Sequence, residues 1–127
     1  MISTGAYNYI NVLEKASVAS SKRHEVLSNN IANSDTPNYK RQDVSFENIL
    51  NGAIHNGDTL DEAVANIELI TLNANVFTDS ASLSYRLDGN NVDIETEYDY
   101  LAENQIRYYT LLDSISQEFT RLQSVIK

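Results

Sequence analysis

The sequence predicts a mainly α protein whose long N- and C-terminal helices pair as an antiparallel coiled coil, with a small irregular or partly β segment between them. Two observations predict this fold. The stretches 6–36 and 90–127 contain neither glycine nor proline, and both carry apolar side chains at helical spacing. We therefore divide the chain into an N-terminal helix (1–34), an extended arm with an acidic irregular middle (35–91), and a C-terminal heptad helix (92–127).

The C-terminal stretch keeps an apolar repeat of 3.5 residues from position 94 to position 126, with Gln105 as its one polar member. A straight helix drifts away from such a stripe, so the repeat is typical of a coiled-coil seam. We also expect Asp93 to cap this helix and Glu103 to pair with Arg107. The predicted helix-packing seam comprises Ile94, Tyr98, Leu101, Tyr108, Leu112, Ile115, Phe119, Leu122 and Ile126.

The N-terminal helix carries two adjacent apolar lines, which predict contact with more than one surface. Two paired helices bury only one side of each, so we expect other chains to cover the second line. The first line is Ala6, Ile10, Leu13, Leu27 and Ile31, and the second is Tyr9, Val12, Ala16, Ala19 and Val26. From both lines together, the residues taken as the packing face are Ile10, Leu13, Ala16, Leu27 and Ile31.

The middle of the chain has a different character. Between positions 42 and 91 eight acidic residues accompany a single basic one, Arg86. We expect a helical turn over 45–50, a short helix or strand over 61–70 and a strand over 81–87. The rest is expected to be irregular, and a connection of this length is usually functional or unfolded until bound.

Composition excludes several classes of function. The 127 residues carry a formal net charge of −9 and no cysteine. An acidic chain is a poor nucleic-acid binder, because phosphate binding needs a basic surface. The lack of cysteine excludes disulfides, thiolate metal ligands and thiol catalysis. We expect no transmembrane segment and no cleaved signal peptide, because no apolar run is long enough for either.

No constellation of residues predicts a catalytic site, a cofactor or a metal. His24 and His55 have no second histidine at ligand spacing, so we expect them on the surface or in packing. The run 88–93 lacks the alternating acids and closing glutamate of a calcium loop and predicts a turn before a helix cap. Acidic side chains are expected at the N-terminal end of a helix from its dipole alone, and this accounts for Asp93, Glu95, Glu97 and Asp99.

Amide side chains cluster around the predicted end of the first helix. Because Thr36 precedes Pro37 and is disfavoured in the helical region, the helix should end near Asn33. Pro37 then presets one corner of a tight turn, and Asn38 can adopt the positive φ of the next corner. Residues 39–41 should leave as an extended arm.

This segment resembles the signature of the bacterial flagellar rod and hook axial proteins, which usually reads N-[aliphatic]-A-N-x-x-T-P-G-Y. Asn38 stands where the family usually has glycine. The short length and the segments 101–108 and 122–126 are similar to the proximal rod subunits of that family, and the resemblance covers roughly residues 1–50 and 90–127. The matching residues are Asn30, Ile31, Ala32, Asn33, Thr36, Pro37, Asn38 and Tyr39.

The resemblance implies a structural subunit of the flagellar basal-body rod, not an enzyme, with no cofactor. It implies export through the flagellar type III apparatus, a periplasmic location, and terminal helices that polymerise to transmit torque for motility, while the arm contacts neighbours. The implied partners are further copies, other rod proteins, a FliE-type adaptor and the base (MS) ring. Another short rod subunit remains an alternative, as does a soluble helical adaptor or export chaperone. An enzyme ranks last for want of a convergent polar site.

Overall fold

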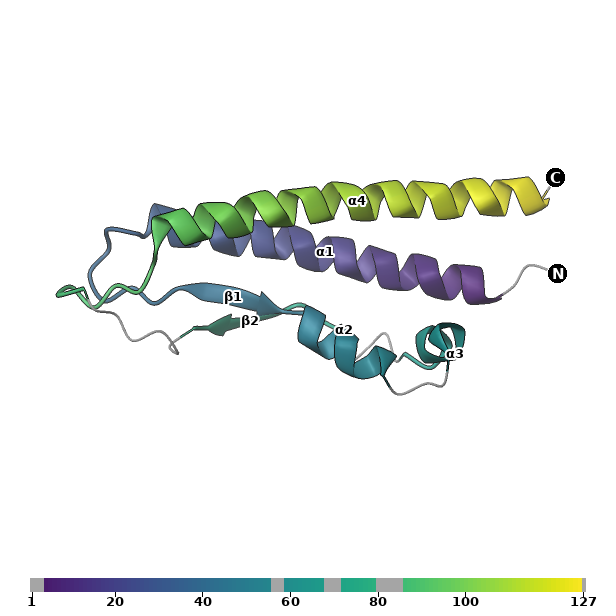
Figure 1. The fold of residues 1–127 in the computed structure, drawn as a ribbon, viewed down its shortest axis with the longest axis horizontal. Helices are drawn as coiled ribbons and strands as arrows, with labels where there is room; N and C mark the ends of the chain where they lie inside the picture. Colours follow the sequence, from purple (N-terminus) through teal and green to yellow (C-terminus); the bar gives the residue numbers. More distant parts are fainter. Residues whose placement is uncertain (1–3, 56–58, 68–71, 80–85, 127) are drawn as a thin grey trace.

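Two long helices lying side by side dominate the computed structural model, which describes residues 4–55, 59–67, 72–79 and 86–126 (Figure 1). Helix α1 spans Thr4–Ala32 and helix α4 spans Ile94–Ile126. Between them lie strand β1 (Gln42–Ser45), helix α2 (Glu47–Ile54), helix α3 (Leu60–Ala65) and strand β2 (Asn75–Thr78). The mainly α fold with a small, partly β centre is therefore confirmed.

Helices α1 and α4 run antiparallel. The start of α1 and the end of α4 lie at one end of the pair, which we call the open end, and the turn motif lies at the other, the closed end (Figure 1). Ser20 contacts Asn104 and Asn30 contacts Glu97, so residue numbers rise on one helix as they fall on the other. Buried apolar side chains on the two helices are Ile10, Ala19, Val26, Leu27 and Leu122.

The middle segment packs along α1 (Figure 1). Strands β1 and β2 form an antiparallel ribbon in which Gln42 pairs with Thr78 and Ser45 pairs with Asn75. An apolar cluster lies between α1 and the middle segment. Its buried members are Ala19, Phe46 and Leu72, and the residues packed against them are Val12, Ala16, Val44, Ile49, Leu50, Ile67 and Ala74. An apolar core thus joins α1 to the middle segment.

The second apolar line of the N-terminal helix is consequently covered by its own chain. Val12, Ala16 and Ala19 belong to the same cluster as Phe46 and Leu72. The expectation that other chains must cover this line was wrong, because the acidic composition of the middle concealed apolar residues that meet only after folding. The chain instead leaves large apolar side chains exposed on α4.

The short elements of the middle agree with expectation only in part. The helical turn expected over 45–50 is helix α2, and the short element expected over 61–70 is helix α3. Residues 68–71 and residues 81–85 of the expected strand lie outside the described residues. Strands β1 and β2 were not predicted, because polar residues such as Asp43 and Asn75 are poor strand formers and each strand has four residues.

The ends of the long helices follow local rules. Helix α1 ends at Ala32, next to the expected Asn33. The Oδ1 atom of Asp93 accepts a hydrogen bond from the N–H of Glu95 over 3.1 Å, which confirms the predicted cap of α4. Glu103 and Arg107 form the expected pair at 3.0 Å. None of the helices in the described part of the chain is long and apolar enough to cross a membrane.

Candidate functional site: a polar lock and an outward apolar row

The signature-like motif builds a tight turn at the closed end. The N–H of Tyr39 donates to the carbonyl of Thr36 over 3.2 Å and closes the turn. Pro37 and Asn38 form its two corners, and Asn38 adopts a φ of 62°. The predicted left-handed corner is therefore confirmed, in a conformation that asparagine tolerates better than most residues other than glycine.

The segment that leads into α4 is joined to this turn. The N–H of Asn38 donates to the carbonyl of Asp88 over 2.7 Å. Asn90 is fully buried, and its Nδ2 lies 2.9 Å from each of the carbonyls of Asn33, Ser34 and Thr36. Residues on both sides of the middle segment are thereby held together at the closed end.

Asn30 of the motif links three parts of the chain. It is fully buried, and its Nδ2 donates to the carbonyl of Gln42 over 2.7 Å and to Oε2 of Glu97 over 3.0 Å. Its Oδ1 accepts from the N–H of Gln42 over 2.9 Å and from the hydroxyl of Tyr39 over 3.1 Å. One amide therefore connects α1, the arm and α4, and an apolar residue in its place would leave these buried polar partners without a bond.

Arg41 and Glu97 form a buried ion pair beside Asn30. Their side chains are 10% and 1% exposed, and Nε of Arg41 lies 2.5 Å from Oε1 of Glu97. Arg41 also contacts Asp43 at 3.2 Å and Asp79 at 2.7 Å. Burial acts to lower the pKa of Arg41, but the hydrogen bond and charge of Glu97, with the two aspartates, outweigh burial and raise that pKa. The guanidinium therefore stays charged inside the protein.

Two further side chains complete this network. Burial acts to raise the pKa of the Asp43 carboxyl, but hydrogen bonds from Arg23 and from the N–H of Val44 outweigh burial and lower it. Burial, and then the charge of Glu97, raise the pKa of the Tyr39 hydroxyl, which keeps it protonated as a donor. We call the set Asn30, Tyr39, Arg41, Asp43 and Glu97 the polar lock.

Sequence reasoning missed three residues of the polar lock, Arg41, Asp43 and Glu97. It also missed Asn104 farther along α4, which bonds Ser20. Glu97 looks like an ordinary acid at the start of a helix, and Arg41 looks like the end of an exposed arm. One signal was available, because Glu97 and Asn104 are seven residues apart and each directly precedes a member of the apolar repeat. That spacing places both on one helix stripe but does not say which way the stripe faces.

Only half of the predicted seam faces α1. Four of its members, Leu101, Tyr108, Ile115 and Leu122, are buried or half-buried, and Ile94 at the helix start is exposed. A second stripe, which we call the outward row, is exposed to solvent and consists of Tyr98, Gln105, Leu112, Phe119 and Ile126. The stripe on the other flank, which we call the inward row, is more buried and consists of Glu97, Asn104, Leu111 and Glu118. The packing role of the outward row stays a prediction.

The predicted face of the N-terminal helix is partly buried. Ile10 and Leu27 are buried, while Leu13, Ala16 and Ile31 are half-buried. Asn30 of the motif is buried, and its residues Asn33 and Tyr39 are half-buried. The exposed motif residues are Ala32, Thr36, Pro37 and Asn38. The motif therefore combines a buried side that builds the closed end with an exposed turn.

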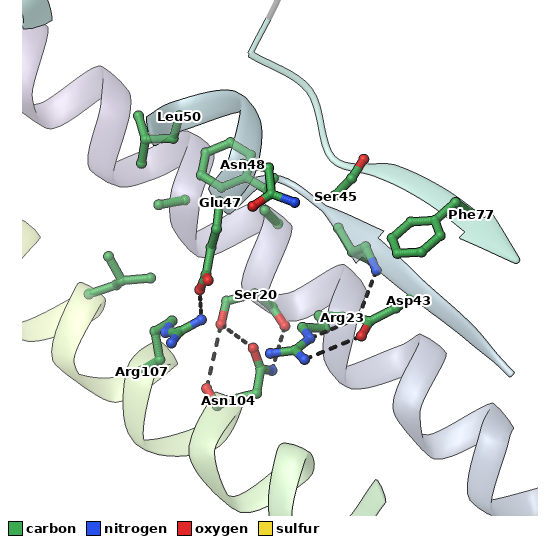
Figure 2. A pocket seen from close by; sticks show the side chains of 15 residues that line it. Ser20, Arg23, Asp43, Ser45, Glu47, Asn48, Leu50, Phe77, Asn104 and Arg107 are labelled. Carbon is green, nitrogen blue, oxygen red and sulfur yellow. Dashed lines mark hydrogen bonds and ion pairs between the residues drawn. The ribbon is translucent and has the colours of Figure 1, made fainter. Parts of the chain in front are cut away.

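A groove of about 320 Å³ lies between α1, the middle segment and α4 (Figure 2). Glu47 pairs with Arg107 across it, and Arg23 pairs with Asp43 at its edge. These charged groups are engaged with each other and do not converge on a reacting centre. No group of metal-ligating side chains occurs in the part of the chain that the structure describes, and His24 and His55 are exposed.

Comparison with known proteins identifies the family of the chain. A sequence model of the family described as "Flagella basal body rod protein" matches residues 10–40, which include the motif and most of α1. The chain is 35% identical to flagellar basal body rod protein FlgB of Bacillus subtilis, over 94% of this chain and 90% of that protein. The chain belongs to the FlgB family of flagellar rod proteins. It is also 36% identical to FlgB of Borrelia hermsii over 96% of this chain and 93% of the relative, and 33% identical to FlgB of Escherichia coli over 84% and 83%.

Membership of the FlgB family confirms the main functional expectation. The chain is a structural protein of the flagellar basal body rod and not an enzyme. The similarity also extends through the middle segment, because the matched part covers nearly the whole chain. The polar lock is thus the architecture of a structural subunit and not a reacting centre.

Proposed function

We propose that this chain is a subunit of the proximal rod that polymerises, with further copies and with other rod proteins, through the outward row of α4. The exposure of this row is the observation that carries the proposal. Tyr98, Leu112, Phe119 and Ile126 are between 40% and 66% exposed along one stripe. Large apolar side chains that gather on a surface mark interaction sites, because their transfer out of water is favourable.

The polar lock supports a mechanical role for the subunit. The 33 residues of α4 form a rod about 50 Å long. Its first turns are joined to α1 and to the arm through Glu97, so a force applied to one element is passed directly to the others. Such a unit is suited to transmit torque across the periplasm once neighbours cover the outward row.

Family membership supports a proposal about the finer partners. We propose that the chain passes through the flagellar type III export apparatus without a cleaved signal peptide and assembles at the base of the rod. There it would contact a FliE-type adaptor and the base (MS) ring as well as other rod proteins. The turn at Pro37 and Asn38 supports contact with such neighbours, because both residues are exposed and follow the end of α1.

The assembly role is tested by Leu112→Asp introduced into the cell's own copy. Leu112 is 40% exposed, so the charge should change the free energy of unfolding of the single chain by less than about 1 kcal/mol. We expect loss of rod assembly in isolated basal bodies and loss of swimming. Thr110→Asp is the matched control, since it adds the same charge at an exposed position outside the outward row. Normal swimming of the Leu112→Asp cells would overturn the proposal.

The purified chain offers a second test. Rod assembly predicts that the chain associates with itself or with other rod proteins in sedimentation experiments, and that Leu112→Asp weakens this association. A protein that stays monomeric at every concentration and with every rod protein would instead favour a helical adaptor or export chaperone.

A further inference from the structure

Helix α4 buries its more polar stripe and exposes its more apolar one. The inward row contains Glu97, Asn104 and Glu118, whereas the outward row contains Tyr98, Leu112 and Phe119. Burial of apolar area alone would favour the opposite arrangement. Adjacent residues lie about 100° apart on a helix. A rotation of α4 by about half that angle would turn the outward row towards α1 and the inward row towards solvent. An interaction other than apolar burial must therefore set the observed orientation.

Asn104 makes directional hydrogen bonds midway along the α1–α4 pair. Its side chain is 1% exposed, and its Oδ1 accepts from the hydroxyl of Ser20 over 2.9 Å while its Nδ2 donates to the carbonyl of Ser20 over 2.8 Å (Figure 2). Two bonds to one residue fix the position of the amide. A rotation of α4 would break both bonds and leave buried polar groups unpaired, which is unfavourable.

Glu97 acts in the same way one heptad earlier. Its two carboxylate oxygens accept from Nδ2 of Asn30 over 3.0 Å and from Nε of Arg41 over 2.5 Å. Because Glu97 and Asn104 lie on one stripe, both sets of bonds oppose rotation in the same direction. The first turns of α4 and its middle are thus held with the inward row against α1.

We propose that Asn104, together with Glu97, is a positioning residue that sets the rotational phase of α4 on α1 and so keeps the outward row facing away from α1. A buried polar residue that specifies the geometry of a helix pair at the expense of stability is a known device in coiled coils. The benefit for rod assembly rests on the proposed function. The phase itself is a property of the single chain and can be measured without assembly.

The test uses the lack of cysteine in the chain. Leu111→Cys and Leu112→Cys, made as separate proteins, place one thiol on each flank of α4. Leu112 is 40% exposed and Leu111 is half-buried, so a small alkylating reagent should modify the Leu112→Cys protein faster. Adding Asn104→Leu, which is similar in size and suited to a helix, removes the directional bonds. We expect the ratio of the two rates to fall from above unity to below unity.

Two controls decide the interpretation, with helicity checked by circular dichroism in each protein. Gln117→Ala also removes an amide, but that amide donates to Asp113 of the same helix, at 2.9 Å, so the rate ratio should not change. Ser20→Ala removes the hydroxyl and keeps the carbonyl, so it should shift the ratio in the same direction by less. If the Asn104→Leu protein is folded and its ratio of alkylation rates is unchanged, the proposal is overturned. If the Asn104→Leu protein is unfolded, an unchanged ratio in the Ser20→Ala protein overturns it.

These measurements are made on dilute monomer. A failure of Leu112→Asp to block the rod would therefore count against the proposed function and leave the rotational phase intact. A failure of the rate ratio to respond would count against the positioning role alone.

Discussion

The closed end and the open end of the hairpin are held by different kinds of interaction. From Ser20 to the closed end, buried polar contacts, Ser20 with Asn104 and Asn30 with Glu97, join the two long helices beside the buried apolar residues Val26 and Leu27. Towards the open end, Ile10 and Leu122 are buried apolar residues, while the outward row remains exposed beside them. Polar contacts are directional and apolar contacts are not. The polar contacts near the closed end therefore fix the orientation of α4 on α1, and the outward row stays available to bind other chains.

The largest expected effect comes from breaking the closed end with Arg41→Ala. This change leaves Glu97 buried without its ion partner, so the free energy of unfolding should fall by about 3–5 kcal/mol. Urea unfolding followed by circular dichroism measures it. Lys22→Ala is the control, because the Lys22–Glu25 pair is 42% and 63% exposed and should contribute less than about 1 kcal/mol. Equal losses in the two variants would contradict the polar lock.

A second comparison sets Leu27→Ala near the closed end against Phe119→Ala in the outward row. Leu27 is fully buried, so its truncation leaves a cavity and should lower the free energy of unfolding by about 2–5 kcal/mol. Phe119 is 51% exposed, and its truncation should change monomer stability by less than about 1 kcal/mol. Phe119→Ala should nevertheless weaken assembly in sedimentation experiments. If both variants destabilised the monomer alike, Phe119 would contribute to the packing of the single chain, and the outward row would not be available to other chains.

The acid sensitivity of the closed end depends on Asp43. Hydrogen bonds from Arg23 and Val44 hold the pKa of Asp43 below its usual range despite burial. Its ionised form therefore stabilises the folded state above the unfolded pKa of about 4, and this contribution is lost as the pH falls through that value toward the folded pKa. Asp43→Asn should be less stable at neutral pH and lose less stability on acidification.

The measurement is the unfolding midpoint between about pH 6 and pH 2. Asp35→Asn, at an exposed position in the turn, is the matched control and should follow the wild-type curve. An Asp43→Asn curve that runs parallel to the wild-type curve would show that this carboxylate does not stabilise the closed end.

The smallest expected effect concerns the turn. A Cβ atom on Gly89, whose φ is +75°, would lie 2.6 Å from Oδ1 of Asn38. Gly89→Ala should therefore cost about 1–3 kcal/mol, in part from the positive φ and in part from this contact. Asn38→Gly removes the contact and restores the family's usual residue. In the double variant the cost of Gly89→Ala should shrink, and strict additivity in the double-mutant cycle would show that the two positions do not touch.

Local patterns predicted the parts of the molecule that depend on neighbours in sequence. The glycine-free and proline-free stretches marked both long helices, Pro37 marked the end of the first, and Asn38 was placed in its left-handed corner. The cap at Asp93 followed from the same kind of rule. These features could be predicted because each depends on backbone preferences within a few residues.

The polar lock and the apolar cluster of the middle segment could not be predicted in this way. Arg41 and Glu97 are 56 residues apart, and Phe46 and Leu72 meet α1 only when the middle segment folds back along it. Neither charge composition nor spacing within the middle segment indicates such contacts. The second apolar line of α1 was assigned to other chains for this reason.

By itself the sequence determined that two long helices form, where the first one ends, and that α4 carries an apolar repeat of 3.5 residues. The tertiary structure alone decided which flank of that repeat turns towards α1. The physical reason is that the repeat predicts burial for two adjacent stripes equally well, and the choice between them depends on hydrogen bonds to residues as distant as Ser20, 84 positions from Asn104.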